Sequence, residues 1–455
     1  MKIIIAGAGR VGTHLAKLFV REKHDIVVLD NNIDQINSLT SNYDLMGKVM
    51  GPTSIKGLKE IGINHCDLFI GVTPDENLNI NSCMIASSLG ARQTVARVDN
   101  TEFLEEESLE YFKSRGIDSL FIPEMVAAKE IVASVKRSWA RMWWEPAGGN
   151  LALIGVKIRQ NCSITNIPLK DLPNKDPAYH IVAIKRGSET IIPHGMDFLK
   201  PYDLVYFMTD KKNQEYIQHI CGKDNYKEVS NVIIMGGGTT AVFTAALMPD
   251  NVKVKIIEEN IKRCYEINSL LSRSNIMVIH GDGRDLALMR EENITDTDAF
   301  IALTPNSEIN IISCLTARKS GVNKTVAILD NLNFLPMAES LDIGTLINKQ
   351  AISASNIYRM ILKADVTNVK SLMVANADVA EFTAAKGSKI TKKLIKDLKL
   401  PLTANLGGLI RNGKGMLING MTQVEAGDKV VAVYVDNDIK PLASLFDCNG
   451  VTGFI

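Results

Sequence analysis

A chain of 455 residues with 51 basic and 51 acidic side chains has no formal net charge and is long enough for several domains. The charge balance gives no electrostatic reason to expect nucleic acid or an anionic membrane surface as a general partner. The longest apolar runs, such as 68–72, are strand-length and far short of the roughly 20 residues that span a bilayer, which excludes a pore.

The N-terminal segment predicts a strand followed by a nucleotide-binding turn. Residues 2–6 are strand-like and run into a G-x-G-x-x-G sequence that opens an amphipathic helix and consists of Gly7, Ala8, Gly9, Arg10, Val11 and Gly12. In a Rossmann domain the first glycine permits the tight turn, the second lets the backbone approach a pyrophosphate, and the third lets the helix pack on the strand. The helix N-terminus then favours the phosphate charge. A glycine turn in an α/β domain without a ligand is the alternative.

Asp30 closes the second predicted strand, 18 positions after Gly12 (30 − 12). A carboxylate at this place accepts hydrogen bonds from the ribose hydroxyls of adenosine and repels a 2′-phosphate. The sequence therefore predicts that NAD(H) is preferred over NADP(H).

The cysteines and the N-terminus indicate a cytoplasmic protein. Seven cysteines are widely scattered without a C-x-x-C pair, which predicts reduced thiols rather than a disulfide framework or a zinc site. The first strand begins without the roughly 7–15-residue apolar region of a secretory signal.

The loop after the fourth predicted strand lies at the topological switch, where ligands of doubly wound sheets bind. Thr73 and Pro74 occupy this loop, and the Thr73 hydroxyl is a candidate contact for a ribose or phosphate. The alternative is helix initiation with Asp75 as the N-cap. Arg97, at the end of the fifth strand, is either a functional residue or a member of a surface ion pair.

The sequence changes character after the first Rossmann pattern. Strand-like runs at 151–158, 180–185 and 203–208 are separated by turns and predict a small mixed lobe. A preceding cluster of Trp139, Trp143 and Trp144, interleaved with arginines, is expected to pack between lobes or subunits rather than on nucleic acid. The polar segment 221–230 predicts a linker.

The second half of the chain repeats the first. Gly9 corresponds to Gly238 and Thr73 to Thr304, at separations of 229 (238 − 9) and 231 (304 − 73) positions. The repeat continues into the lobes, where 163–165 parallels 389–391. The duplicated unit is therefore about half of the chain.

The second copy predicts a second nucleotide site. Its turn consists of Gly236, Gly237 and Gly238, followed by Thr239 and Thr240, and its acidic residue is Glu258. The two threonines are expected to cap the helix and to hydrogen-bond a phosphate. Gly281 and Asp282, after the third strand, lie where an adenine edge would sit, or else form only a tight turn. Thr304 repeats Thr73 with Asn306 as the N-cap, whereas Ile328 replaces Arg97.

No catalytic set accompanies these binding signatures. The sequence contains no Tyr-x-x-x-Lys pair, no H-E-x-x-H, no G-x-S-x-G and no P-loop. A ligand sensor therefore fits better than an enzyme. An NAD-dependent oxidoreductase with an unrecognised active site and a scaffold that binds no nucleotide are the alternatives.

Taken together, these segments resemble the family of TrkA proteins and RCK domains, the regulators of potassium conductance. The resemblance spans essentially the whole chain and is closer to the duplicated TrkA type than to the single-repeat KtrA type. The residues that carry it are 3–12, Asp30, 72–77, 95–98 and 363–366.

The resemblance implies a non-enzymatic subunit on the cytoplasmic face of the cell membrane that binds NAD(H), and in some relatives ATP or ADP. It implies a ring of four chains that gates a TrkH-like potassium-translocating membrane subunit. The ligand contacts that it carries over are Gly7, Gly9, Arg10, Val11, Asp30, Thr73 and Arg97, and in the second half Gly236, Gly238, Glu258, Asp282 and Thr304. Asp99 stands where family members often carry a second arginine.

The expected fold class is α/β, with a tandem duplication of a doubly wound parallel sheet of the Rossmann type plus a small α+β lobe of the RCK-C type. The expected domains are a first Rossmann domain, a first lobe, a second Rossmann domain and a second lobe, with the bounds 1–137, 138–224, 230–363 and 364–455.

Overall fold

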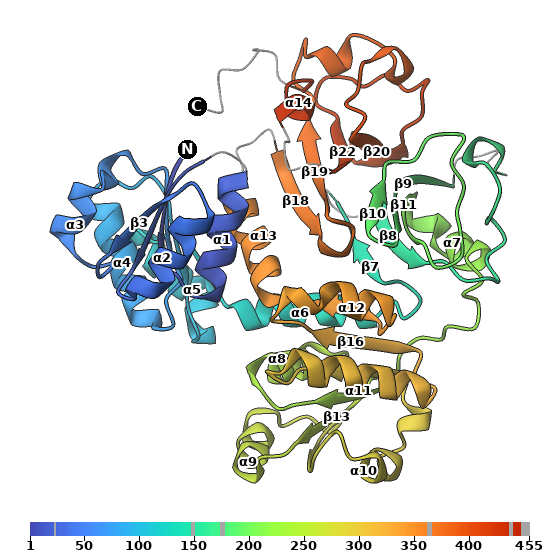
Figure 1. Ribbon diagram of the computed structural model, residues 1–455, viewed down its shortest axis with the longest axis horizontal. Helices are drawn as coiled ribbons and strands as arrows, with labels where there is room; N and C mark the ends of the chain where they lie inside the picture. The colour runs from blue at the N-terminus through green and yellow to red at the C-terminus, as the bar shows by residue number, and fades with distance from the viewer. Residues whose placement is uncertain (22–23, 147–150, 173–177, 362–365, 436–439, 447–455) are drawn as a thin grey trace.

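The computed structural model describes residues 1–21, 24–146, 151–172, 178–361, 366–435 and 440–446. Figure 1 shows two Rossmann domains and two lobes, with each lobe following its Rossmann domain in the chain. The predicted fold class is confirmed. The segment 363–366, which contributed to the family resemblance, lies outside the described residues except for Val366, and so does the proposed boundary at 363 and 364.

The first Rossmann domain contains a six-stranded parallel sheet in the order β3-β2-β1-β4-β5-β6, which reverses direction at β1 and β4. Its strands are β1 (Lys2–Ala6), β2 (Asp25–Asp30), β3 (Met46–Val49), β4 (Leu68–Gly71), β5 (Thr94–Arg97) and β6 (Ser119–Phe121). The helices that follow them are α1 (Arg10–Arg21), α2 (Ile33–Asn42), α3 (Ile55–Glu60), α4 (Glu76–Ser88), α5 (Glu106–Ser114) and α6 (Pro123–Val135). The predicted first strand, and Asp30 as the last residue of the second, are confirmed.

The second Rossmann domain repeats this topology in the order β14-β13-β12-β15-β16-β17. Its strands are β12 (Asn231–Met235), β13 (Lys253–Glu258), β14 (Ile276–His280), β15 (Ala299–Ala302), β16 (Lys324–Ile328) and β17 (Thr345–Ile347). Its helices are α8 (Thr239–Leu247), α9 (Ile261–Leu270), α10 (Leu286–Glu291), α11 (Ser307–Lys319), α12 (Leu335–Ser340) and α13 (Lys349–Ile361).

Each lobe is built on a five-stranded antiparallel sheet, in the orders β10-β9-β11-β8-β7 and β18-β19-β22-β20-β21. The first lobe contains β7 (Met142–Trp144), β8 (Leu151–Lys157), β9 (Tyr179–Arg186), β10 (Glu189–Ile191), β11 (Leu204–Asp210) and α7 (Gln214–Ile220). The second contains β18 (Val366–Leu372), β19 (Ala377–Thr383), β20 (Ala404–Arg411), β21 (Lys414–Leu417), β22 (Lys429–Val435) and α14 (Lys440–Ala443).

Two helices cross between the halves. α6 follows the first sheet in the chain, yet Ile131 and Val135 lie in the core of the second Rossmann domain. α13 follows the second sheet, yet Ala354 and Ile357 lie in the core of the first. Each Rossmann core is therefore completed by a helix from the other half, as the positions of α6 and α13 in Figure 1 show.

Paired charges hold the first lobe against the second Rossmann domain. Asp342 has a positive φ of 53° in the turn after α12. Its carboxylate lies 2.8 Å from Nη2 of Arg141 and 3.1 Å from Nη1 of Arg318, and it also pairs with Arg159. Arg141 directly precedes β7 and Arg159 follows β8, so both belong to the first lobe, whereas Arg318 and Asp342 belong to the second Rossmann domain. The three arginines and Asp342 therefore form an interdomain joint.

A buried lysine and the tryptophans complete this joint. The ammonium of Lys324, which is 2% exposed, donates to the carbonyl oxygen of Ala140 at 2.7 Å. Arg137 lies 3.8 Å from the ring centroid of Trp143. Trp144 belongs to a core shared by the sheets of both lobes. The prediction that the tryptophan cluster packs between lobes is confirmed for Trp144, whereas Trp139 and Trp143 pack in the core of the first lobe.

Candidate functional site

The first glycine turn has the backbone geometry that a phosphate site requires. Gly7 adopts a positive φ of 115°. A Cβ atom at Gly12 would lie 1.8 Å from the carbonyl oxygen of Gly7, so only glycine fits there. Apart from its two chain neighbours, a Cβ atom at Gly9 would meet no atom of the described residues within 4 Å. The space in front of Gly9 is therefore not filled by the protein, which leaves room for a ligand to approach the backbone.

Asp30 is held at this turn by the backbone. Its Oδ2 accepts a hydrogen bond from the Ala8 amide at 2.7 Å, and its Oδ1 accepts one from the Asn32 amide at 2.8 Å. An ionised carboxylate has about four acceptor positions, so each oxygen keeps capacity for one more donor. Asp30 is thus oriented before any ligand arrives and can still accept hydrogen bonds from ribose hydroxyls.

The second turn repeats this arrangement. Gly236 has a positive φ of 97°, and a Cβ atom at Gly238 would meet no protein atom within 4 Å. The carboxylate of Glu258 accepts from the Gly237 amide at 2.7 Å and from the Asn260 amide at 2.8 Å. The carboxylate hydrogen bonds of the first site therefore recur in the second.

Arg263 is a second-site residue that the sequence analysis missed. Its Nε donates to the carbonyl oxygen of Gly237 at 2.8 Å, and its Nη1 lies 2.8 Å from the Glu266 carboxylate. A guanidinium is thereby fixed directly behind the second glycine turn. Its position on α9 carries no motif, so the sequence alone gave no signal for it.

The expected capping role of Thr239 and Thr240 is wrong. The N-cap of α8 is Gly238, without a side-chain capping bond, and both threonines lie inside the helix. Thr240 is 6% exposed, so its side chain faces protein, while Thr239 is exposed. Because no side chain caps α8, the first amides of this helix have no side-chain acceptor. They are therefore free to bind an anion at the helix N-terminus.

The threonines after the fourth strands are tied into the loop. The Thr73 hydroxyl donates to Oδ1 of Asn79 at 2.8 Å. Asp75 caps α4 by accepting from the amides of residues 77 and 78, and Asn306 caps α11 in the same way, by accepting from the Ile309 amide. The helix-initiation interpretation is therefore confirmed for both loops, and Pro74 lies within the first of them.

Two buried asparagines, absent from the sequence-based site, set the shape of these loops. Asn79, with 0% exposure, donates from Nδ2 to the carbonyls of Thr73 and Arg97 at 3.0 Å each. Asn310 repeats these bonds to Thr304 and Ile328 at 2.8 and 3.0 Å. The two asparagines are 231 positions apart (310 − 79), which is the offset of the repeat. A polar residue that recurs in both copies on the core-facing side of a helix was the signal by which the sequence could have revealed them.

Arg97 is half-buried at the edge of the first site. Its Nη2 lies 3.1 Å from the Asp99 carboxylate, and 22% of its side chain is exposed. Its Nε is buried without a hydrogen-bond partner among the described residues. The ion-pair interpretation is confirmed, and one donor of the guanidinium is left without a protein acceptor.

A cavity of about 1550 Å³ opens at the second turn. Ligand pockets usually have volumes of about 300–1,000 Å³, so this one has room for a dinucleotide. Part of its wall comes from the first half of the chain, in the form of Arg10, Thr13, His14 and Lys17 from α1. The second site is therefore assembled from both halves.

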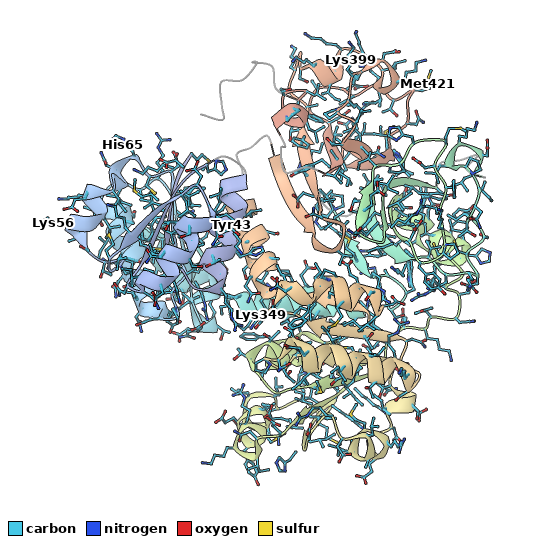
Figure 2. The ribbon with its side chains drawn as sticks, viewed as in Figure 1. Tyr43, Lys56, His65, Lys349, Lys399 and Met421 are labelled. Atoms are coloured by element: carbon cyan, nitrogen blue, oxygen red, sulfur yellow. The ribbon has the colours of Figure 1, made fainter. Side chains whose placement is uncertain are left out.

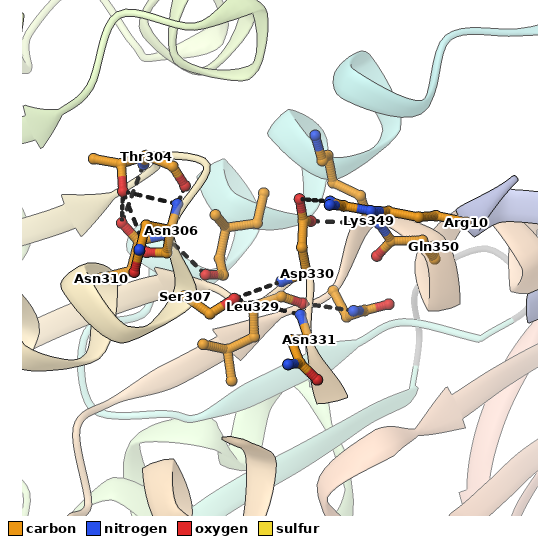
Figure 3. Close-up of polar contacts among 12 residues, drawn as sticks. Arg10, Thr304, Asn306, Ser307, Asn310, Leu329, Asp330, Asn331, Lys349 and Gln350 are labelled. Carbon is orange, nitrogen blue, oxygen red and sulfur yellow. Dashed lines mark hydrogen bonds and ion pairs between the residues drawn. The ribbon is translucent and has the colours of Figure 1, made fainter. Parts of the chain in front are cut away.

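Figure 3 shows Arg10 reaching Asp330, and both residues line this cavity. Nη1 of Arg10 lies 2.9 Å from Oδ2 of Asp330, at the end of the loop after β16. Gln350 donates to the same carboxylate at 3.4 Å, and Lys349 lies beside it. Figure 2 places Lys349 at the start of α13, between the two Rossmann domains. An arginine of the first glycine turn thus contacts the wall of the second site.

Gly281 and Asp282 line the same cavity. The Asp282 carboxylate is paired with Arg284, with Nη2 to Oδ2 at 2.7 Å, and the hydrogen bond from Arg284 lowers the pKa of Asp282. The Gly281 amide donates to the carbonyl of Glu258 at 3.0 Å. The Asp285 amide donates to the carbonyl of Asp282 at 3.0 Å, which confirms the tight-turn interpretation, and the turn also borders the candidate site.

No group of three or more histidine, cysteine or acidic side chains that could hold a metal ion is found in the described ranges. In the same ranges no helix is both long enough and apolar enough to cross a membrane.

Comparison with known families gives two matches. The TrkA-N domain matches residues 3–123 and 232–349, which together make up more than half of the chain. The TrkA-C domain matches residues 379–447, in the second lobe.

Full-length relatives carry the same description. A Trk system potassium uptake protein TrkA from Halomonas elongata is 29% identical, with 100% of both chains covered. A protein of the same name from Vibrio alginolyticus is 30% identical, with 96% of each chain covered.

Solved structures share the fold at low identity. The GsuK channel matches with a TM-score of 0.61 and 15% identity over 97% of this chain and 78% of the channel. The GsuK channel bound to NAD gives a TM-score of 0.60 at 14% identity over 98% and 78%. GsuK bound to ADP gives 0.50 at 12% identity over 79% and 69%.

Proposed function

Because the chain belongs to the TrkA family of regulatory, non-enzymatic subunits of Trk potassium uptake, we propose that it senses adenine nucleotides and gates a potassium-translocating membrane subunit. The ligand at both glycine turns is NAD(H), with ATP or ADP as further ligands. The contacts are the residues predicted from the sequence at the two turns, with Asp30 and Glu258 on the ribose.

The open space at Gly9 and Gly238 is the observation that carries this proposal. A glycine whose missing side chain would touch no protein atom has no packing reason to be glycine. A pyrophosphate against the turn amides supplies that reason, because a Cβ atom would stand in its path. The spare acceptor positions of the two carboxylates fit the sugar of the same ligand.

The choice of nucleotide follows from charge. A carboxylate repels a 2′-phosphate, which favours NAD(H) over its phosphorylated form at both turns. The related folds bound to NAD and to ADP support an adenine nucleotide.

Gating follows from unequal affinity. A ligand shifts a conformational equilibrium only if it binds one conformation more tightly, and each tenfold ratio is worth about 1.4 kcal/mol. The second site lies between α1 and the second Rossmann domain, so a change in the angle between the two domains alters its wall. We place the subunit on the cytoplasmic face of the membrane, as a ring of four chains beneath a TrkH-like partner.

Substitution of Asp30 tests the first site. Asp30→Ala removes the ribose acceptor, and we expect NADH affinity at this site to fall at least tenfold in a fluorescence titration. Asp25→Ala, which changes an exposed carboxylate at the opposite end of the same strand, is the matched control. Unchanged affinity in a folded Asp30→Ala protein would remove the proposed site, and circular dichroism checks the fold.

A further inference from the structure

The first lobe contains two cysteines on segments that lie against each other. Cys162 follows β8, and Cys221 caps the end of α7, 59 positions later (221 − 162). On one side of the pair, the Ser163 amide donates to the carbonyl of Ile220 at 3.0 Å. On the other side, Nδ2 of Asn161 donates to the carbonyl of Gly222 at 2.8 Å.

These contacts place the two cysteines opposite one another. The bonded pairs 163 with 220 and 161 with 222 bracket 162 with 221 in antiparallel order. Neither segment is a strand, but the two bonds hold the segments side by side, and a disulfide requires a Cα separation of about 4.4–6.8 Å. The close approach is fixed by Gly222, where a Cβ atom would lie 2.5 Å from Nδ2 of Asn161.

The two thiols also interact with each other. Their interaction lowers the pKa of Cys162 and raises the pKa of Cys221. The other described cysteines instead donate from their thiols to backbone carbonyls of other residues. These cysteines are Cys66, Cys83, Cys264 and Cys314. The pair formed by Cys162 and Cys221 therefore differs from the isolated core thiols.

The surroundings favour a thiolate on Cys162. Lys223 is 4% exposed, and its charge adds to the lowering of the pKa of Cys162. Cys162 is 4% exposed and Cys221 is 0% exposed. An oxidant therefore reaches these thiols only through local opening of the structure, and a small peroxide needs less room than a bulky disulfide reagent.

We propose that Cys162 and Cys221 are a redox pair that hydrogen peroxide oxidises to an intramolecular disulfide. The Cys162 thiolate attacks one peroxide oxygen, so that an S–O bond forms, the O–O bond breaks, and hydroxide leaves to take up a proton as water. The Cys221 sulfur then attacks the Cys162 sulfenic sulfur, and the second oxygen leaves as water. Two thiols and one peroxide give one disulfide and two waters.

The bond would fasten the interdomain joint. Cys162 lies on the loop of Arg159, which pairs with Asp342 of the second Rossmann domain. Cys221 begins the segment 221–230 that leads into β12. A disulfide would therefore tie the loop that holds the joint to the segment that connects the halves. The second lobe has Ser388 at the position of Cys162, so this device belongs to the first lobe alone.

The test uses the full-length wild-type protein. After treatment with hydrogen peroxide, free thiols are alkylated and the unreduced protein is digested with trypsin for mass spectrometry. We expect the peptides 160–170 and 213–223 to be linked, with two hydrogen atoms lost and the link reversed by dithiothreitol. Cys162→Ser and Cys221→Ser abolish the link, and Cys314→Ser, which removes an isolated buried thiol, retains it.

Three results would overturn the proposal. These are alkylation of both cysteines after peroxide treatment, oxidation of Cys162 to sulfinic or sulfonic acid without a link, and a link from either cysteine to another partner such as Cys448. Because the wild-type chain gives the primary result, a failure of the serine variants to fold does not affect the test.

Discussion

At the scale of single residues, substitution of two glycines of the first turn is expected to affect different properties, ligand affinity at Gly9 and stability at Gly12. Gly9→Ala places a methyl group where no protein atom lies, so we expect a stable protein whose NADH affinity is at least tenfold lower. Gly12→Ala forces a methyl group against the Gly7 carbonyl, and we expect a loss of about 1–3 kcal/mol in unfolding free energy. Urea unfolding and NADH titration of both variants check the contrast. Equal affinity of Gly9→Ala and wild type would contradict the ligand role of this turn.

The sequence predicted site residues where a motif fixes spacing and missed those that act across the fold. Asp30 and Glu258 were found because each ends a strand at a set distance from a glycine turn. The contact of Arg10 with Asp330 joins residues 320 positions apart, and no local pattern reports such a pair. The prediction that Thr239 and Thr240 cap α8 was wrong because the helix begins at Thr239. A threonine caps a helix only from the N-cap position, which Gly238 occupies.

At the scale of elements, the crossed helices predict long-range effects of core substitutions. Ile357→Ala removes buried contacts from α13, and we expect a loss of about 2–5 kcal/mol. The loss should appear in hydrogen exchange as reduced protection of β1 and β2, in the other half of the chain. Ile312 lies on α11 and is 63% exposed, so Ile312→Ala is the control and should leave those strands protected. Reduced protection confined to the second half would contradict the packing of α13 described above.

Most elements were predictable because their periodicity is strong. The strand 2–6 was found with its observed bounds, and strands of the first lobe were found to within about two residues. The crossing of α6 and α13 was not predicted, because periodicity shows which helix face is apolar but not which sheet that face covers. The family resemblance, carried by motifs spread over the whole chain, was confirmed by the domain matches.

At the scale of the whole molecule, Asp342 is expected to control how the first lobe docks. Asp342→Ala leaves Arg141, Arg159 and Arg318 without their carboxylate, and leaving such partly buried charges unpaired costs about 1–3 kcal/mol. We expect the lobe to separate and the segment 221–230 to become sensitive to limited proteolysis. Asp296→Ala removes an exposed carboxylate of the same domain and should cleave like wild type. An uncleaved Asp342→Ala protein would show that the charges do not hold the joint.

The same joint predicts a response to acid. Burial raises the pKa of Asp342, but Arg141, Arg159 and Arg318 together lower it below its usual value. A depressed carboxyl pKa stabilises the folded state above the unfolded pKa of about 3.9 and loses this contribution as the pH falls through the folded pKa. The contribution of Asp342 to docking should therefore be complete at about pH 5 and be lost only below about pH 4. Fluorescence of the three tryptophans, all near the joint, checks this, and a transition near neutral pH would contradict it.

Because α6 and α13 are exchanged within one polypeptide, the two candidate nucleotide sites need not have the same sequence. A symmetric dimer of single units must carry every substitution twice, whereas here Arg97 of the first copy corresponds to Ile328 of the second, and Gly12 corresponds to Ala241. Covalent fusion also fixes their stoichiometry at one to one and keeps each within reach of its counterpart. A substitution at one candidate site therefore need not appear at the other.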